Sequence, residues 1–173
     1  EKVEELLLAY REPLGEGGLR GKAEQRLRIA LADLLVSSAE AWEEAEEEYT
    51  KVLEHEANHP EALGGLEGVF RALERTDSLR DLLLHRVEHC DDPEEQWVRL
   101  EELARLSIDV FGAPEEAIRC YQTMGNLRPD DAELRERLIP LYEECGQHRS
   151  LVDALLERAG ETQREEQRVA DTL

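Results

Sequence analysis

The sequence predicts an all-α fold in which about ten short helices stack side by side as a solenoid. Three observations predict it. Strong helix formers, chiefly Glu, Leu, Ala and Arg, dominate the chain of 173 residues. Apolar residues recur three and four positions apart, and no run alternates apolar with polar residues. The chain also repeats itself after a shift of 72 residues, the interval from Leu31 to Leu103.

Five helices are predicted in the first half of the chain. The second carries an apolar stripe at helical spacing that includes Leu27, Leu31 and Leu34. The glycine-rich stretch 15–21 precedes that helix, and Pro60 opens the fourth. The predicted spans are 2–11, 21–37, 39–55, 60–74 and 77–90.

Five more helices are predicted in the second half. Asp92 and Asp131 stand where a side chain caps a helix start, and Pro114 suits the first turn of the helix that it opens. Gly146 and Gly160 mark helix ends. The predicted spans are 93–110, 114–127, 131–145, 149–160 and 162–172.

The 72-residue shift superposes many residues of like chemistry. Leu31 meets Leu103, and Tyr49 meets Tyr121. A unit of this length holds four of the predicted helices, so it divides into two helix pairs of about 36 residues, the size of an α-solenoid repeat. We therefore expect residues 1–173 to form a single repeat array, a piece of a longer protein.

The best-defined pair resembles a tetratricopeptide repeat (TPR). That family places a Gly in the turn, then a small residue, an aromatic residue and a Pro at fixed spacings, and Gly112, Ala117, Tyr121 and Pro129 stand at those spacings. The first helix also fits if one extra residue precedes the turn; its four matching positions are Leu100, Leu103, Ala104 and Ser107. The resemblance implies a right-handed superhelix whose concave groove is lined by the first helix of each pair and binds peptides or helices of partner proteins.

The charge balance narrows the range of partners. Acidic residues number 42 against 21 Lys and Arg, which gives a net charge of −21. Such a chain repels nucleic acids and anionic membranes, and no uncharged apolar run approaches the length of a membrane span. We expect a cytoplasmic scaffold without cofactor or catalytic activity, binding a protein or peptide of basic character. The terminal helices, 2–11 and 162–172, suggest self-association as a further possibility.

Glycines inside a predicted helix suggest where a partner binds. Gly64 and Gly68 lie four residues apart, away from the apolar stripe, although each glycine costs a helix about 1 kcal/mol relative to Ala. We expect them to let a partner approach closely; close packing against a neighbouring helix is the alternative. The same groove would include five charged residues: Arg71, Glu101, Arg105, Glu133 and Glu136.

Two clusters suggest metal chemistry instead. Residues 55–59 spell HExxH, which in zinc-dependent hydrolases places His55 and His59 on one helix face. Pro60 follows directly, however, so a solvated turn is the favoured interpretation. His85 and His89, with the adjacent Cys90, form a second cluster that lacks complementary ligands. Cys120 and Cys145 suit small core positions, and Trp97 suits packing between hairpins or a contact anchor. A third possibility is an architectural spacer with no groove ligand.

Overall fold

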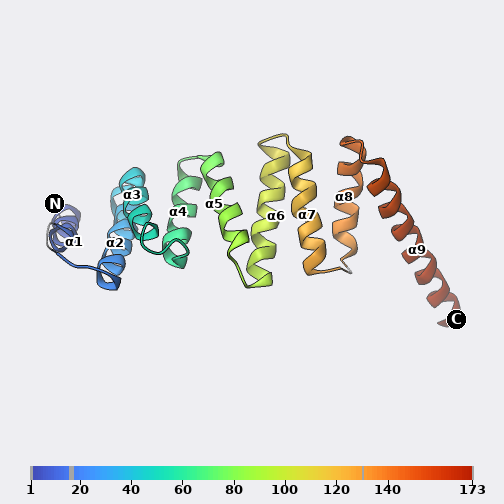
Figure 1. Cartoon of the computed structure of the whole chain (residues 1–173), viewed down its shortest axis with the longest axis horizontal. Helices are drawn as coiled ribbons and strands as arrows, with labels where there is room; N and C mark the ends of the chain where they lie inside the picture. The colour runs from blue at the N-terminus through green and yellow to red at the C-terminus, as the bar shows by residue number, and fades with distance from the viewer. Residues whose placement is uncertain (1, 16–17, 130, 173) are drawn as a thin grey trace. The chain divides into compact units, whose positions relative to one another are not determined.

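The computed structural model describes residues 2–15, 18–129 and 131–172, and within these ranges it contains helices and no strands, as predicted (Figure 1). The chain divides into two compact units, Glu1–His85 and Arg86–Leu173. Helix α5 (Thr76–Glu88) contains the point of division. The expectation of one continuous repeat array stays a prediction.

The first unit is built around the central helix α3 (Trp42–Leu53), which packs against both α2 (Lys22–Leu34) and α4 (Pro60–Ala72). Helix α1 (Lys2–Arg11) packs against α2. A short 3-10 helix, Glu12–Leu14, follows α1, and a π-helical turn, Leu35–Ala39, extends α2. Of the predicted stripe, Leu31 is buried, whereas Leu27 and Leu34 are partly buried. The buried core of this unit includes Leu31, Leu35, Ala45, Tyr49, Val52, Leu63, Leu66 and Val69.

The second unit follows the same plan. Helix α7 (Pro114–Leu127) packs against α6 (Pro93–Asp109) and α8 (Ala132–Glu144), and α8 packs against α9 (His148–Thr172). Most residues at the TPR-like positions are buried, whereas Gly112 and Pro129 are exposed. The buried residues include Leu100, Leu103, Ala104, Ser107, Ala117, Tyr121, Leu134 and Tyr142.

The hairpin turns reproduce the 72-residue period. A residue in the left-handed conformation ends the first helix of each pair: Glu40 (φ 50°), Glu74 (φ 54°), Gly112 (φ 57°) and Gly146 (φ 64°). Glu40 and Gly112 are 72 residues apart, and so are Glu74 and Gly146. The backbone therefore repeats even where the sequence has Glu in place of the usual glycine.

The closing hydrogen bonds alternate with the same period. At Glu40 and Gly112 the N–H of the next residue donates to a carbonyl six positions back, and at Glu74 and Gly146 it donates five positions back. The turns at Glu40 and Gly112 are therefore one residue longer than the other two. The turn at Gly112 thus contains the extra residue that the TPR resemblance required before this glycine. The four bonds run from Ala41 to Leu35 (3.1 Å), from Arg75 to Phe70 (2.9 Å), from Ala113 to Ser107 (2.8 Å) and from Gln147 to Tyr142 (2.8 Å).

Two predicted helix starts are confirmed in detail. The carboxylate of Asp92 accepts a hydrogen bond from the Glu94 N–H at 3.0 Å. The carboxylate of Asp131 accepts bonds from the N–H groups of Glu133 at 3.0 Å and Leu134 at 3.3 Å. These caps satisfy backbone donors that lack a partner in the first helical turn.

The prediction of ten helices was wrong at one place. Gly160 does not end a helix, and the predicted spans 149–160 and 162–172 form the single helix α9. Gly160 has no positive φ, whereas Gly112 and Gly146 do. A glycine without a turn around it is tolerated inside a helix at modest cost. The described ranges thus hold nine α-helices, none of which is both long and apolar enough to cross a membrane.

Candidate functional site

Arg137 joins two residues of the predicted groove in the second unit. Its Nη1 donates to Glu101 Oε1 at 2.9 Å, and its Nη2 donates to Glu133 Oε1 at 2.7 Å. Glu101 lies on α6 and the other two residues on α8, so the contact connects two first helices of the repeat pairs. Hydrogen bonds from Arg137 to Glu133 and to Glu101 raise the pKa of the guanidinium.

Trp97 forms the adjoining part of this surface. The guanidinium carbon of Arg128 lies 4.0 Å from the centre of the Trp97 ring, and Arg128 also pairs with Glu94 at 2.5 Å. The arrangement is a cation–π contact on a partly exposed ring. A cavity of about 180 Å³ lies beside this contact. It is separate from a cavity of about 310 Å³ in the same unit, which is described below. The lining of the smaller cavity is Trp97, Glu101, Arg128, Asp131, Glu133, Leu134 and Arg137.

Exposed apolar side chains flank the charged ones on α6. Val98 is 55% exposed and Ile108 is 40% exposed. Together with Glu101 and Arg105 they occupy positions three, four and three residues apart, which places all four on one side of the helix. Sequence reasoning missed both apolar residues, although the spacing from Glu101 and Arg105 was available. We call this surface, with Trp97 and the α8 residues Glu133, Glu136 and Arg137, the α6–α8 face.

Glu136 and Arg105 complete the predicted set in this unit. Glu136 accepts a hydrogen bond from Arg158 of α9 at 3.2 Å, and both side chains are about half exposed. Arg105 is exposed on α6. The structure thus unites Glu101 and Glu133 around one cation and leaves the other two at the margins of the face.

In the first unit, the predicted glycines are exposed on α4. A Cβ atom added to Gly64 or Gly68 would meet nothing within 4 Å, so these two glycines do not serve helix packing. Arg71 lies one turn further along and pairs with Glu67 at 2.6 Å. We call Gly64, Gly68 and Arg71 the α4 strip. The close-packing role that was the alternative belongs instead to the neighbouring Gly65.

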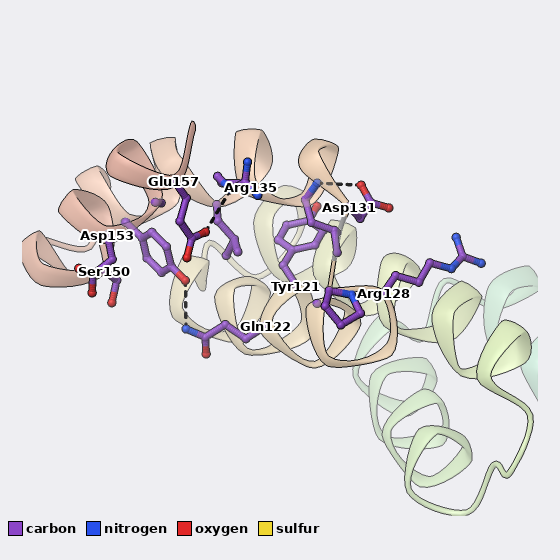
Figure 2. Close-up of a pocket in the computed structure, with 14 residues that line it drawn as sticks. Tyr121, Gln122, Arg128, Asp131, Arg135, Ser150, Asp153 and Glu157 are labelled. Atoms are coloured by element: carbon purple, nitrogen blue, oxygen red, sulfur yellow. Dashed lines mark hydrogen bonds and ion pairs between the residues drawn. The ribbon is translucent and has the colours of Figure 1, made fainter. Parts of the chain in front are cut away.

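A larger pocket opens among α7, α8 and α9 (Figure 2). Its volume is about 310 Å³, at the lower end of the range typical of ligand pockets. Sequence reasoning did not find it, because its residues come from three helices and share no motif. The lining consists of Tyr121, Gln122, Gly125, Arg128, Pro129, Asp131, Leu134, Arg135, Leu138, Tyr142, Ser150, Asp153, Ala154 and Glu157. We call it the α7–α9 pocket.

The HExxH stretch does not have the geometry of a zinc-dependent hydrolase. Helix α3 ends at Leu53, and residues 54–59 form turns before α4 begins at Pro60. His55 and His59 therefore do not share a helix face. Among the side chains that the structure describes, no group of three or more His, Cys, Asp or Glu is placed to hold a metal ion.

The remaining candidates have structural partners. His85 Nε2 lies 2.8 Å from Asn58 Oδ1, and the Cys90 thiol donates to the Asp92 carbonyl at 3.3 Å. Cys120 is buried in the core, and burial raises the pKa of its thiol to about 11. Cys120 is therefore protonated near neutral pH and unsuited to nucleophilic attack.

Helix α3 carries five acidic residues between Glu43 and Glu48, and this acidic run is partly neutralised. Glu44 pairs with Arg11, Glu46 with Arg75 at 2.6 Å, and Glu48 with Arg28 at 2.7 Å. Arg28 also binds Glu24 at 2.7 Å. The run thus helps to hold the first unit together in addition to presenting charge to solvent.

Comparison with known proteins supports the fold. No protein-family profile and no curated protein matches the sequence. Among solved structures, the chain is similar to MamA AMB-1 in space group P212121, with a TM-score of 0.56 and 15% identity over 94% of this chain and 84% of that one. A second MamA crystal structure gives 0.51 and 15% over 95% and 91%. These are TPR proteins, so the chain has a TPR-like fold, as the motif spacing predicted.

Proposed function

We propose that the protein is an interaction scaffold that binds an extended peptide or a helix of a partner protein. The binding surfaces would be the exposed sides of the first helices of the repeat pairs. These are the α4 strip in the first unit and the α6–α8 face in the second. The TPR resemblance assigns partner binding to these helices. The proposal rests mainly on one observation, that the partly exposed Trp97 and the exposed Val98 and Ile108 occur together on the α6–α8 face.

These three side chains have the character of a binding surface. Protein interfaces combine a few apolar or aromatic anchors with surrounding polar groups, and Trp is among the residues that contribute most. Exposed Val98 and Ile108 lie on the same side of α6 as Glu101 and Arg105. Since the buried stripe of α6 is on its other side, packing within the unit does not account for the two apolar residues.

Charge favours a partner with basic character. Glu101 and Glu133 share the single cation of Arg137, so this trio retains net negative charge. The whole chain carries −21, which extends the attraction beyond the site. We therefore expect association to be faster at low salt than at high salt.

The test compares the unchanged chain and three variants as baits in lysate of the source organism. Val98→Glu places a charge on the α6–α8 face. Val152→Glu is the matched control, because Val152 is 52% exposed on α9, against 55% for Val98. The third variant, Gly64→Leu with Gly68→Leu, adds side chains to the α4 strip at positions where a Cβ atom would meet nothing within 4 Å. Captured proteins are identified by mass spectrometry, and their affinities are measured with purified components.

A partner held by the unchanged chain and by Val152→Glu, but lost with Val98→Glu, would support the proposal. Loss with the double glycine variant would extend it to the α4 strip. The same proteins on all baits would refute it and favour an architectural spacer. Metal analysis of untagged protein tests the interpretation of the HExxH stretch as a turn, and a stoichiometric amount of zinc would contradict that interpretation.

A further inference from the structure

The α7–α9 pocket has apolar side chains at its base. Leu134, Tyr142 and Ala154 are buried beneath it, and Leu138 is half-buried. Tyr121, labelled in Figure 2, and Tyr142 both line the pocket with their rings. Tyr142 is fixed in place, because its hydroxyl accepts a hydrogen bond from Gln122 Nε2 at 3.1 Å. Such rings favour a cation placed near their faces.

One wall of the pocket is acidic. Asp153 and Glu157 lie four residues apart on α9, and therefore on the same side of that helix. Glu157 accepts a hydrogen bond from Arg135 Nε at 3.3 Å. Within the described part of the chain, Asp153 forms no ion pair, so one carboxylate at the wall is not neutralised.

The basic residues of the lining are already engaged. Arg135 Nη2 donates to Glu161 Oε1 at 2.9 Å, and Nη1 donates to the other oxygen of the same carboxylate. Arg128 contributes to the lining, but its guanidinium lies over Trp97 and points away from the pocket (Figure 2). Asp131, the third acid, accepts backbone hydrogen bonds at the start of α8. The charge left for a ligand is therefore negative.

Gly125 keeps the pocket open on the α7 side. A Cβ atom added there would meet nothing within 4 Å, and the residue has no positive φ. Neither packing nor backbone geometry thus requires glycine at this position. Because Gly125 lines the pocket, we expect a larger side chain at this position to occupy part of the pocket.

We propose that the α7–α9 pocket binds one lysine or arginine side chain of a partner protein. The methylene stem would lie against Leu138 and the tyrosine rings, and the cationic group would pair with Asp153 and Glu157. A stem that is buried while its charged end meets a carboxylate is a common way for these residues to bind. The inference rests on the proposed scaffold function and extends it to a third site, which uses α7 and α9 rather than the α4 strip or the α6–α8 face.

The experiment selects random dodecapeptides displayed on phage against the immobilised intact chain. The selected peptides are then synthesised with a fluorophore, and binding is measured by anisotropy. Each Lys or Arg is replaced in turn by norleucine, which keeps an aliphatic stem without the charge. We expect one replacement to weaken binding about tenfold, because it removes a charge pair in a partly buried site.

Variants of the chain locate the effect. Gly125→Leu fills the pocket and should weaken binding about tenfold, as loss of a central contact does. Gly125→Ala is the matched control and should bind as the unchanged chain does, since it adds one methyl group to open space. Asp153→Asn should weaken binding several-fold and reduce its dependence on salt. Circular dichroism verifies that all variants fold.

Three results would overturn the inference: no peptide enriched above the bare support, no loss with norleucine, or unchanged binding to Gly125→Leu. The Val98→Glu variant separates this inference from the proposed function. Peptides lost with Val98→Glu but retained by Gly125→Leu would support the α6–α8 face and reject the pocket. Peptides lost only with Gly125→Leu would support the pocket.

Discussion

Gly65 of α4 lies directly against the phenol ring of Tyr49 of α3. A Cβ atom added to Gly65 would overlap Cζ of the ring and its two neighbouring carbons. The ring has no room to move, because Tyr49 is 2% exposed and its hydroxyl donates to Asp33 at 2.6 Å. Helices α3 and α4 can therefore lie this close together only because Gly65 has no Cβ atom.

We predict that Gly65→Ala destabilises the protein although Ala is the better helix former. Overpacking a close contact costs roughly 1–3 kcal/mol, and the gain in helix propensity of about 1 kcal/mol offsets only part of that. The net loss should be up to about 2 kcal/mol. Urea unfolding followed by circular dichroism measures it.

The controls are the two other glycines of the same helix. Gly64→Ala and Gly68→Ala place their methyl groups in open space, so each should stabilise the protein by about 0.5–1 kcal/mol. If all three substitutions had the same sign, the contact with Tyr49 would not be the reason for Gly65.

Tyr49 also predicts a dependence of stability on alkaline pH. Burial, together with the hydrogen bond to Asp33, raises the pKa of Tyr49 above its usual value. The folded state thus keeps a proton that the unfolded state releases near pH 10. The contribution of Tyr49 is complete below about pH 10 and is lost as pH rises above it, by up to about 1.4 kcal/mol per pH unit.

Tyr49→Phe should remove the contribution of Tyr49 to the pH dependence of the free energy of unfolding. The variant should be about 1 kcal/mol less stable near neutral pH, because the hydrogen bond to Asp33 is lost. Its free energy of unfolding should then fall less steeply than that of the unchanged chain at alkaline pH. Midpoints of urea unfolding, measured for both proteins over the alkaline range, test this. If the midpoints of the two proteins fell in parallel with pH, the prediction would be contradicted.

The contact between Arg128 and Trp97 can be followed by fluorescence. In a Trp42→Phe background, Trp97 is the single tryptophan. Arg128→Ala uncovers one face of the ring, so the emission should move to longer wavelength. Stability should change by less than about 1 kcal/mol, because the contact is exposed to solvent.

Arg137→Ala provides the comparison. It removes the two hydrogen bonds to Glu101 and Glu133 but leaves Arg128 over Trp97. Its emission should match that of the background. An equal shift in both variants would indicate a general loosening of the α6–α8 face rather than loss of one cation–π contact.

The repeat and its turns could be predicted from the sequence because they depend on local chemistry. Gly112 and Gly146 favour the left-handed conformation by themselves, and the spacing of Ala117 and Tyr121 fixes the pairing around the first turn. Glu74 is instructive, since it adopts the same conformation without glycine. There the packing of the hairpin overrides the preference of the single residue.

The candidate sites could be predicted only where one helix carries them. The exposed positions of Gly64, Gly68 and Glu101 follow from helical spacing, and they are exposed in the structure. The link from Glu101 to Arg137 joins two helices, and the α7–α9 pocket needs three. No local pattern in the sequence encodes such combinations, because they depend on how helices pack in each unit.

Gly160 offers a direct test of the continuous helix α9. Its φ is not positive, and an added Cβ atom would meet nothing within 4 Å. Gly160→Ala should therefore raise helicity and stabilise the second unit by about 0.5–1 kcal/mol. Gly146→Ala is the opposite case, because Gly146 has φ 64°, and it should destabilise by about 1 kcal/mol. Thermal and urea unfolding compare the two. Destabilisation by Gly160→Ala would show that residue 160 ends a helix after all, and would restore the two separate helices that the sequence had suggested.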